Sequence, residues 1–184
     1  MSILIDLQDR NWMKDSDLKQ LISSDLPGIP IYCGEPNKKL PSVVMAIVIK
    51  KLDQNTLRKL PNLRLIQKVG AGVENMMSNC NLPKHIKVCR MSSEIQAKEM
   101  AEYCLAEVLA YQRNIREYFN NQSLKIWKQR QPSIVKEKSV SILGLGLIGM
   151  EIAQTLKNFG FTVFGWSKTA KAQSNFTNYT GIDG

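Results

Sequence analysis

A glycine-rich segment at residues 144–149 constrains this 184-residue chain more than any other feature. It reads Gly144-Leu145-Gly146-Leu147-Ile148-Gly149, follows a strand-like run at 139–143 and precedes a helical pattern over 150–159. A lone G-x-G-x-x-G is weak evidence, but strand, tight turn and helix start form the context that dinucleotide-binding folds require. We expect Gly144 to permit the turn, Gly146 to let the backbone approach a diphosphate, and Gly149 to let the helix pack on the strand. All six residues are therefore predicted to bind a dinucleotide at the start of the helix, and the alternative is a turn that merely connects two elements.

The residues after the next expected strand, 161–166, bear on the choice of cofactor. A cofactor with a free ribose 2′-hydroxyl usually meets Asp or Glu about twenty residues past such a motif. Here the chain reads Ser167-Lys168-Thr169-Ala170-Lys171 instead. No carboxylate repels a 2′-phosphate, so NADP is favoured over NAD, with Ser167, Lys168 and Thr169 at the adenosine end. The alternative is that these lysines are ordinary loop residues.

The first ninety residues alternate strand-like and helix-like segments, which predicts an open parallel sheet with crossover helices. The expected strands are 3–7, 29–33, 43–49, 63–69 and 86–91, and the expected helices are 15–26 and 53–60. From 93 to 127, apolar residues recur at helical spacing, which indicates one long helix or two in succession. Pro132 favours a domain boundary near 128–136.

Composition excludes several classes of protein. Apolar residues make up 43% and charged residues 22%, as in folded globular domains. The net charge of +9 comes from scattered lysines, which argues against specific nucleic-acid binding. The longest apolar run, 43–49, is far shorter than the roughly 20 residues of a membrane span, and the N-terminus lacks a basic leader, so we expect a cytoplasmic protein with no membrane partner.

Neither the cysteines nor the histidine form a metal or catalytic pattern. No Cys-x-x-Cys spacing occurs, so the cysteines are predicted to be reduced thiols in or near the core, with no metal site; they are Cys33, Cys80, Cys89 and Cys104. His85 is the only histidine, and we expect it at the surface.

Four segments in order resemble the D-isomer specific 2-hydroxyacid dehydrogenases, and within them the glyoxylate/hydroxypyruvate reductase A branch. These segments are Val69-Gly70-Ala71-Gly72-Val73-Glu74, residues 96–103, residues 141–149 and residues 165–169. The resemblance implies an α/β protein in three parts. A flavodoxin-like substrate domain occupies 1–95, a long crossing and dimerisation helix region 96–130, and an incomplete Rossmann domain, its first β-α-β unit, 131–184.

The resemblance also implies an activity, the NAD(P)H-dependent reduction of a small 2-oxo acid, glyoxylate or hydroxypyruvate. Backbone amides of Ala71, Gly72 and Val73 would bind the substrate carboxylate, since successive amides hold an anion without a charged side chain. Family members commonly dimerise through the crossing helices, so a homodimer is expected; packing within the chain alone is the alternative.

The catalytic arginine, glutamate and histidine of this family lie beyond the first βαβ unit. No catalytic residue is therefore predicted here, and we expect a C-terminally truncated chain that is inactive alone and leaves apolar sheet surface uncovered. The alternative function is a non-catalytic dinucleotide-binding or dimerisation module that partners an intact paralogue.

Overall fold

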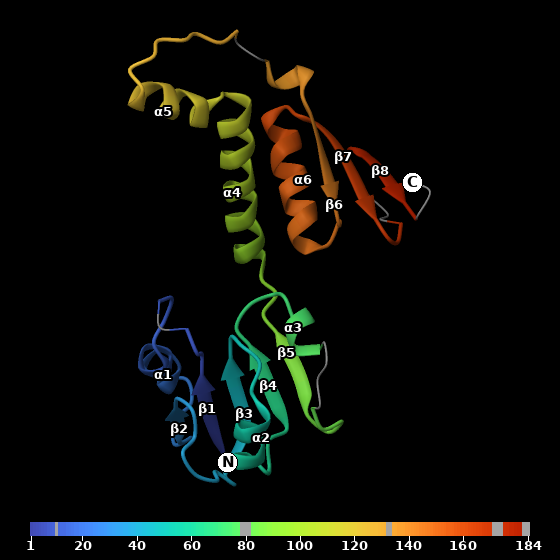
Figure 1. Ribbon diagram of the computed structural model, residues 1–184. Coiled ribbons are helices and arrows are strands. Elements are labelled where there is room, and N and C mark those ends of the chain that lie inside the picture. Colours follow the sequence, from blue (N-terminus) through green and yellow to red (C-terminus); the bar gives the residue numbers. More distant parts are fainter. Residues whose placement is uncertain (10, 78–81, 132–133, 171–174, 182–184) are drawn as a thin grey trace. The chain divides into compact units, whose positions relative to one another are not determined.

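The computed structural model describes residues 1–9, 11–77, 82–131, 134–170 and 175–181 (Figure 1). It divides into two compact units, Met1–Ser92 and Ser93–Gly184. The first unit contains β1 (Ser2–Asp6), α1 (Asp15–Ser23), β2 (Ile31–Cys33), β3 (Val43–Val48), α2 (Gln54–Lys59), β4 (Leu65–Lys68), α3 (Glu74–Met77) and β5 (Lys87–Arg90).

The first unit is built on a five-stranded parallel sheet with the order β2-β1-β3-β4-β5. Every residue of β1 is buried, which is typical of a parallel strand covered on both faces. Because side chains alternate along a strand, Leu4 and Ile5 enter different clusters on opposite faces of the sheet.

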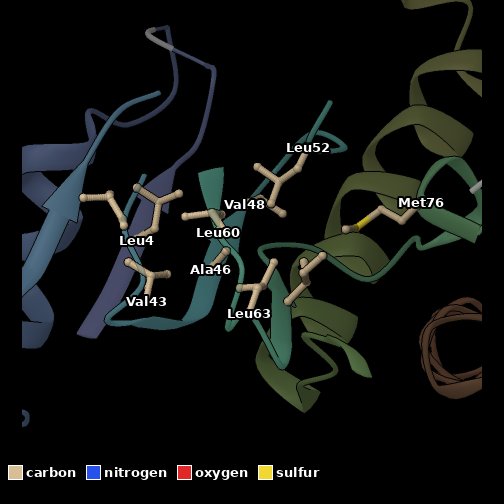
Figure 2. Packing of buried hydrophobic residues seen from close by; sticks show 10 residues of the cluster. Leu4, Val43, Ala46, Val48, Leu52, Leu60, Leu63 and Met76 are labelled. Atoms are coloured by element: carbon tan, nitrogen blue, oxygen red, sulfur yellow. The ribbon is translucent and has the colours of Figure 1, made fainter. Parts of the chain in front are cut away.

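Helices cover both faces of this sheet. Leu18 and Ile22 of α1 pack against one face, beside Ile3 and Ile5. The other cluster joins strand residues to Leu57 of α2 and Met76 of α3, and Figure 2 shows eight of its members with labels: Leu4, Val43, Ala46, Val48, Leu52, Leu60, Leu63 and Met76. The parallel α/β architecture predicted for the N-terminal half is confirmed.

The second unit begins with two helices in succession, α4 (Glu94–Gln112) and α5 (Ile115–Ser123). Asn114 separates them in a left-handed conformation, with φ at 55°, which interrupts the helical hydrogen bonds. The unit continues with the short 3₁₀ helix η1 (Val135–Glu137), β6 (Ser139–Leu143), α6 (Leu147–Phe159), β7 (Thr162–Ser167) and β8 (Thr177–Thr180).

The sheet of the second unit is parallel and has the order β6-β7-β8, with α6 packed on one face (Figure 1). Leu105, Val108 and Leu109 of α4 join the same apolar cluster, so α4 lies against α6. The glycine-rich turn lies between the end of β6 and the start of α6.

Among the described residues of this unit, the other face of the sheet carries exposed apolar side chains. Leu143 is 81% exposed and Tyr179 is 45% exposed. With Phe164 and Trp166 they line a groove of about 340 Å³. We call the surface formed by Leu143, Phe164, Trp166 and Tyr179 the open sheet face.

Two features differ from the sequence-based expectations. The structure adds a third strand, β8, where only β-α-β was predicted; the alternation in Phe176-Thr177-Asn178-Tyr179 was the available signal, with Phe176 buried. Cys33 and Cys89 are exposed rather than in the core, because they lie on β2 and β5, the two edge strands.

Other expectations stand as follows. Cys104 is half-buried, and Cys80 lies outside the described residues. His85 is exposed, as predicted.

The division into 1–95, 96–130 and 131–184 stays a prediction. Residues 132–133 fall outside the described ranges, and the helix α4 groups with the second compact unit. Within the described ranges, no helix has the length and apolar character needed to cross a bilayer.

Candidate functional site

The glycine-rich turn is held in shape by two of its glycines. Gly144 has φ at 106°, a backbone conformation that residues with a side chain rarely adopt. Its N–H donates a hydrogen bond to the Trp166 carbonyl at 2.8 Å. A Cβ on Gly149 would lie 1.9 Å from the Gly144 carbonyl oxygen. The first turn of α6 therefore packs directly on the backbone of the preceding loop.

The remaining surface of this turn is open. A Cβ on Gly146 would meet nothing within 4 Å, and Gly146 caps α6 without a side-chain hydrogen bond. The first amides of a helix have no partner within the helix, so those of Leu147, Ile148 and Gly149 point out of its end. Leu145 faces the core and is 3% exposed. This combination of open space, unprotected amides and a helix start fits a dinucleotide diphosphate.

The residues after β7 form a tight turn. Ser167 is buried, and its hydroxyl donates to the Thr169 carbonyl at 2.8 Å. Lys168 and Thr169 are exposed at the carboxyl end of the strand. Ser167 thus shapes the turn, while Lys168 and Thr169 present an ammonium and a hydroxyl group to solvent. Lys171 lies outside the described residues.

The loop that follows β4 in the first unit also exposes backbone donors. Gly70 has φ at 129°, and its carbonyl accepts from the Met91 N–H at 3.2 Å. Within the described part of the chain, the N–H groups of Ala71, Gly72 and Val73 donate to no protein acceptor. Unpaired amides in succession are the groups that a carboxylate ligand can satisfy.

Two basic residues that sequence reasoning missed flank this loop. The Arg90 Nη1 donates to the Ala71 carbonyl at 3.1 Å. The Lys68 Nζ lies 3.4 Å from the position that a Cβ on Gly70 would take. They are the last residues of β4 and β5, and each lies one position before the end of a predicted strand, 63–69 or 86–91, which was the available signal.

One buried carboxyl group belongs to neither site. Asp6 ends β1, is 3% exposed, and accepts from Gln8 Nε2 at 3.0 Å. Burial raises the pKa of Asp6, the hydrogen bond from Gln8 opposes that rise, and the nearby carboxylates of Asp15, Glu35 and Asp53 add to it. Asp6 is thus a source of pH-dependent stability.

A cavity of about 730 Å³ lies between α5 and the segment that follows it, away from the glycine-rich turn. The segment folds back on α5 because Arg130 makes paired hydrogen bonds to Glu117 and its N–H donates to the Tyr118 hydroxyl at 3.1 Å. The Arg130 hydrogen bond holds the pKa of Glu117 below its usual range. No cluster of His, Cys, Asp or Glu suited to a metal occurs in the ranges that the structure describes.

The fold and the turn define a class: the second unit is a Rossmann-like nucleotide-binding domain. Residues 105–183 match the family described as D-isomer specific 2-hydroxyacid dehydrogenase, NAD binding domain. The chain belongs to this family.

Particular relatives are reductases. Glyoxylate/hydroxypyruvate reductase A of Photorhabdus laumondii is 36% identical over 120 residues, 62% of this chain and 38% of the relative. The same-named protein of Yersinia enterocolitica is 32% identical over 133 residues, 70% of this chain and 42% of the relative. The chain thus spans about two fifths of the length of these relatives.

The chain is also similar to solved structures of this family. The D-isomer specific 2-hydroxyacid dehydrogenase of Xanthobacter autotrophicus Py2, in complex with NADPH and MES, is 27% identical with a TM-score of 0.83. The similarity covers 99% of this chain and 58% of that chain. Both compact units therefore have counterparts in one enzyme of this family.

Proposed function

We propose that this chain forms the cofactor-phosphate and substrate-carboxylate parts of an NADPH-dependent 2-oxo acid reductase of the glyoxylate/hydroxypyruvate type. The observation that carries the proposal is the open helix start at Gly146, where a Cβ would meet nothing within 4 Å among the described residues and the first amides of α6 have no partner within the helix. Gly144, Leu145, Gly146, Leu147, Ile148 and Gly149 would hold the diphosphate. The names of the relatives, together with the NADPH complex of one of them, support this reading.

The cofactor preference rests on the turn after β7. Lys168 and Thr169 offer an ammonium and a hydroxyl group to a 2′-phosphate, and Ser167 holds the turn through its bond to Thr169. No carboxylate occurs between Ser167 and Ala170 to repel that phosphate. NADP is therefore preferred over NAD.

The substrate part lies in the first unit. The free amides of Ala71, Gly72 and Val73 bind the carboxylate of the 2-oxo acid and orient its carbonyl carbon. When bound, the reduced nicotinamide supplies the hydride. Polarisation of the carbonyl and protonation of the alkoxide need a cation and a general acid, which family resemblance does not assign to any residue among 1–184. Residues 1–184 alone are thus expected to bind and not to turn over.

A titration tests the cofactor part. We expect NADPH to quench tryptophan fluorescence at lower concentration than NADH, and Lys168→Ala to weaken NADPH while leaving NADH unchanged. Gly146→Val fills the open space and abolishes both, while Lys157→Ala, at the other end of α6, is the control. Tighter binding of NADH than of NADPH contradicts the preference, and NADPH oxidation with glyoxylate that Gly146→Val abolishes contradicts the expected inactivity.

The partner proposal is a homodimer through α4 and α5. Large apolar side chains on these helices and the segment after them are exposed, namely Ile95, Met100, Tyr103, Tyr111, Phe119, Leu124, Ile126 and Trp127. Light scattering is expected to give the mass of a dimer, with Tyr111→Glu shifting it to a monomer and Trp12→Glu, in the first unit, as the control. A monomeric wild type contradicts the homodimer, and a mixed dimer formed with an intact relative favours the alternative of a non-catalytic partner module. A cytoplasmic location stays a prediction.

A further inference from the structure

Lys68 and Arg90 end two neighbouring parallel strands side by side. They are direct partners in the register between β4 and β5, so their side chains leave the sheet on the same face. Among the described residues, neither takes part in an ion pair. Two like charges at adjacent positions repel each other, and an anion bound close to them would lessen that repulsion.

The end of β5 fixes two peptide planes of the loop. The Met91 N–H donates to the Gly70 carbonyl, and Arg90 donates to the Ala71 carbonyl. In a trans peptide the carbonyl and the following N–H point in opposite directions. These two bonds therefore turn the N–H groups of Ala71 and Gly72 away from β5, which is where they remain unpaired.

A carboxylate of the chain itself lies beside these amides. The Glu74 Oε2 is 2.9 Å from the position that a Cβ on Gly72 would take, yet Glu74 accepts no hydrogen bond from the loop amides. Glu74 is exposed, so its side chain can move away. Its negative charge would compete with any anion that approaches Gly72.

We propose that Arg90 is a positioning residue for an anion site formed by the Ala71, Gly72 and Val73 amides, and that Lys68 and Glu74 set its affinity. Lys68 attracts the ligand and Glu74 repels it. Arg90 acts through the Ala71 carbonyl, since its guanidinium lies on the side of the peptide opposite the Gly72 N–H. The inference rests on the proposed function in taking the ligand to be the carboxylate of a small 2-oxo acid.

Amide chemical shifts test this in the full chain, with sodium glyoxylate titrated at constant ionic strength. In wild type, the shifts of residues 71–73 are expected to move and saturate. Arg90→Gln is expected to displace the amide shift of Gly72 in the absence of ligand. It is also expected to weaken glyoxylate binding at least tenfold, which is about the effect of losing the charge-assisted hydrogen bond from the Gly72 N–H to the carboxylate. Arg90→Lys retains a donor and restores part of the affinity. Lys68→Gln weakens binding a few-fold, and Glu74→Gln strengthens it.

Lys87→Gln is the matched control, because it removes the same charge from the other end of β5. If glyoxylate leaves the wild-type amides of 71–73 unmoved, the proposed carboxylate site fails. If those amides respond but Arg90→Gln binds as Lys87→Gln does, the proposed function stands and the positioning role of Arg90 is overturned. If Arg90→Gln does not fold, Arg90→Lys tests the same role, because a lysine at this position can still donate one hydrogen bond to the Ala71 carbonyl. Complete loss of glyoxylate binding in Arg90→Lys would contradict the positioning role.

Discussion

Gly149→Ala should destabilise the cofactor turn although it improves an intrinsic helix preference. The added Cβ would lie 1.9 Å from the Gly144 carbonyl oxygen and 3.0 Å from its carbon. That is roughly 1.5 Å inside ordinary contact, and a backbone atom cannot rotate away as a side chain can. Overpacking costs up to about 3 kcal/mol, while alanine in place of glycine gains about 1 kcal/mol in a helix. The net loss is therefore about 2 kcal/mol.

Hydrogen exchange of the α6 amides measures this loss locally, which suits a chain of two units. A loss of about 2 kcal/mol corresponds to roughly thirtyfold faster exchange of the protected amides. The control is Gly146→Ser, because a Cβ at this position meets nothing within 4 Å and serine is a favourable N-cap residue. Unchanged exchange in Gly149→Ala, or equal effects of the two substitutions, would refute the packing argument.

Three further predictions concern other parts of the chain. Asp6→Asn should stabilise the first unit at neutral pH, because burial raises the pKa of Asp6 in the fold and the ionised form is the costly one. This gain in the free energy of unfolding, measured by urea denaturation, should shrink as the pH falls through the raised pKa of Asp6 and vanish below the ordinary pKa range of a carboxyl group. Asp25→Asn, at an exposed position, is the control and should show no such trend. Ser93→Ala should cost about 1 kcal/mol at the start of α4, since the Ser93 hydroxyl accepts from the Gln96 N–H at 3.1 Å; exchange of the first α4 amides measures it, and no acceleration contradicts the cap. Native alkylation should label Cys33 and Cys89, with the Cys33 rate still rising at pH above the usual thiol range because burial raises its pKa; mass spectrometry that finds Cys33 unmodified would contradict its exposure.

Local patterns predicted the elements whose cause is local. The turn at Gly144 and the start of α6 follow from glycine positions, and the break between α4 and α5 was one of two outcomes left open by the helical spacing. The exposure of Cys33 and Cys89 depends instead on which strands lie at the sheet edges, and strand order is not written in hydrophobic periodicity.

The loop at 70–73 illustrates the same limit for the site. Its glycines predicted an accessible backbone, and the free amides of residues 71–73 agree with an accessible loop. The contribution of Arg90 required the register of β5 against β4, which brings together residues 19 positions apart in the chain. The pairing that orients the amides was therefore beyond the reach of motif reasoning.

The open sheet face has a practical consequence for spectroscopy. Dyes such as anilinonaphthalene sulfonate fluoresce on exposed apolar surface, and their binding is commonly taken as a sign of a molten globule. In this chain the folded state itself presents Leu143 and Tyr179 beside Phe164 and Trp166. Dye fluorescence should thus be high when the protein is native and should fall on unfolding. Loss of ordered packing around Trp166 is better followed by near-ultraviolet circular dichroism.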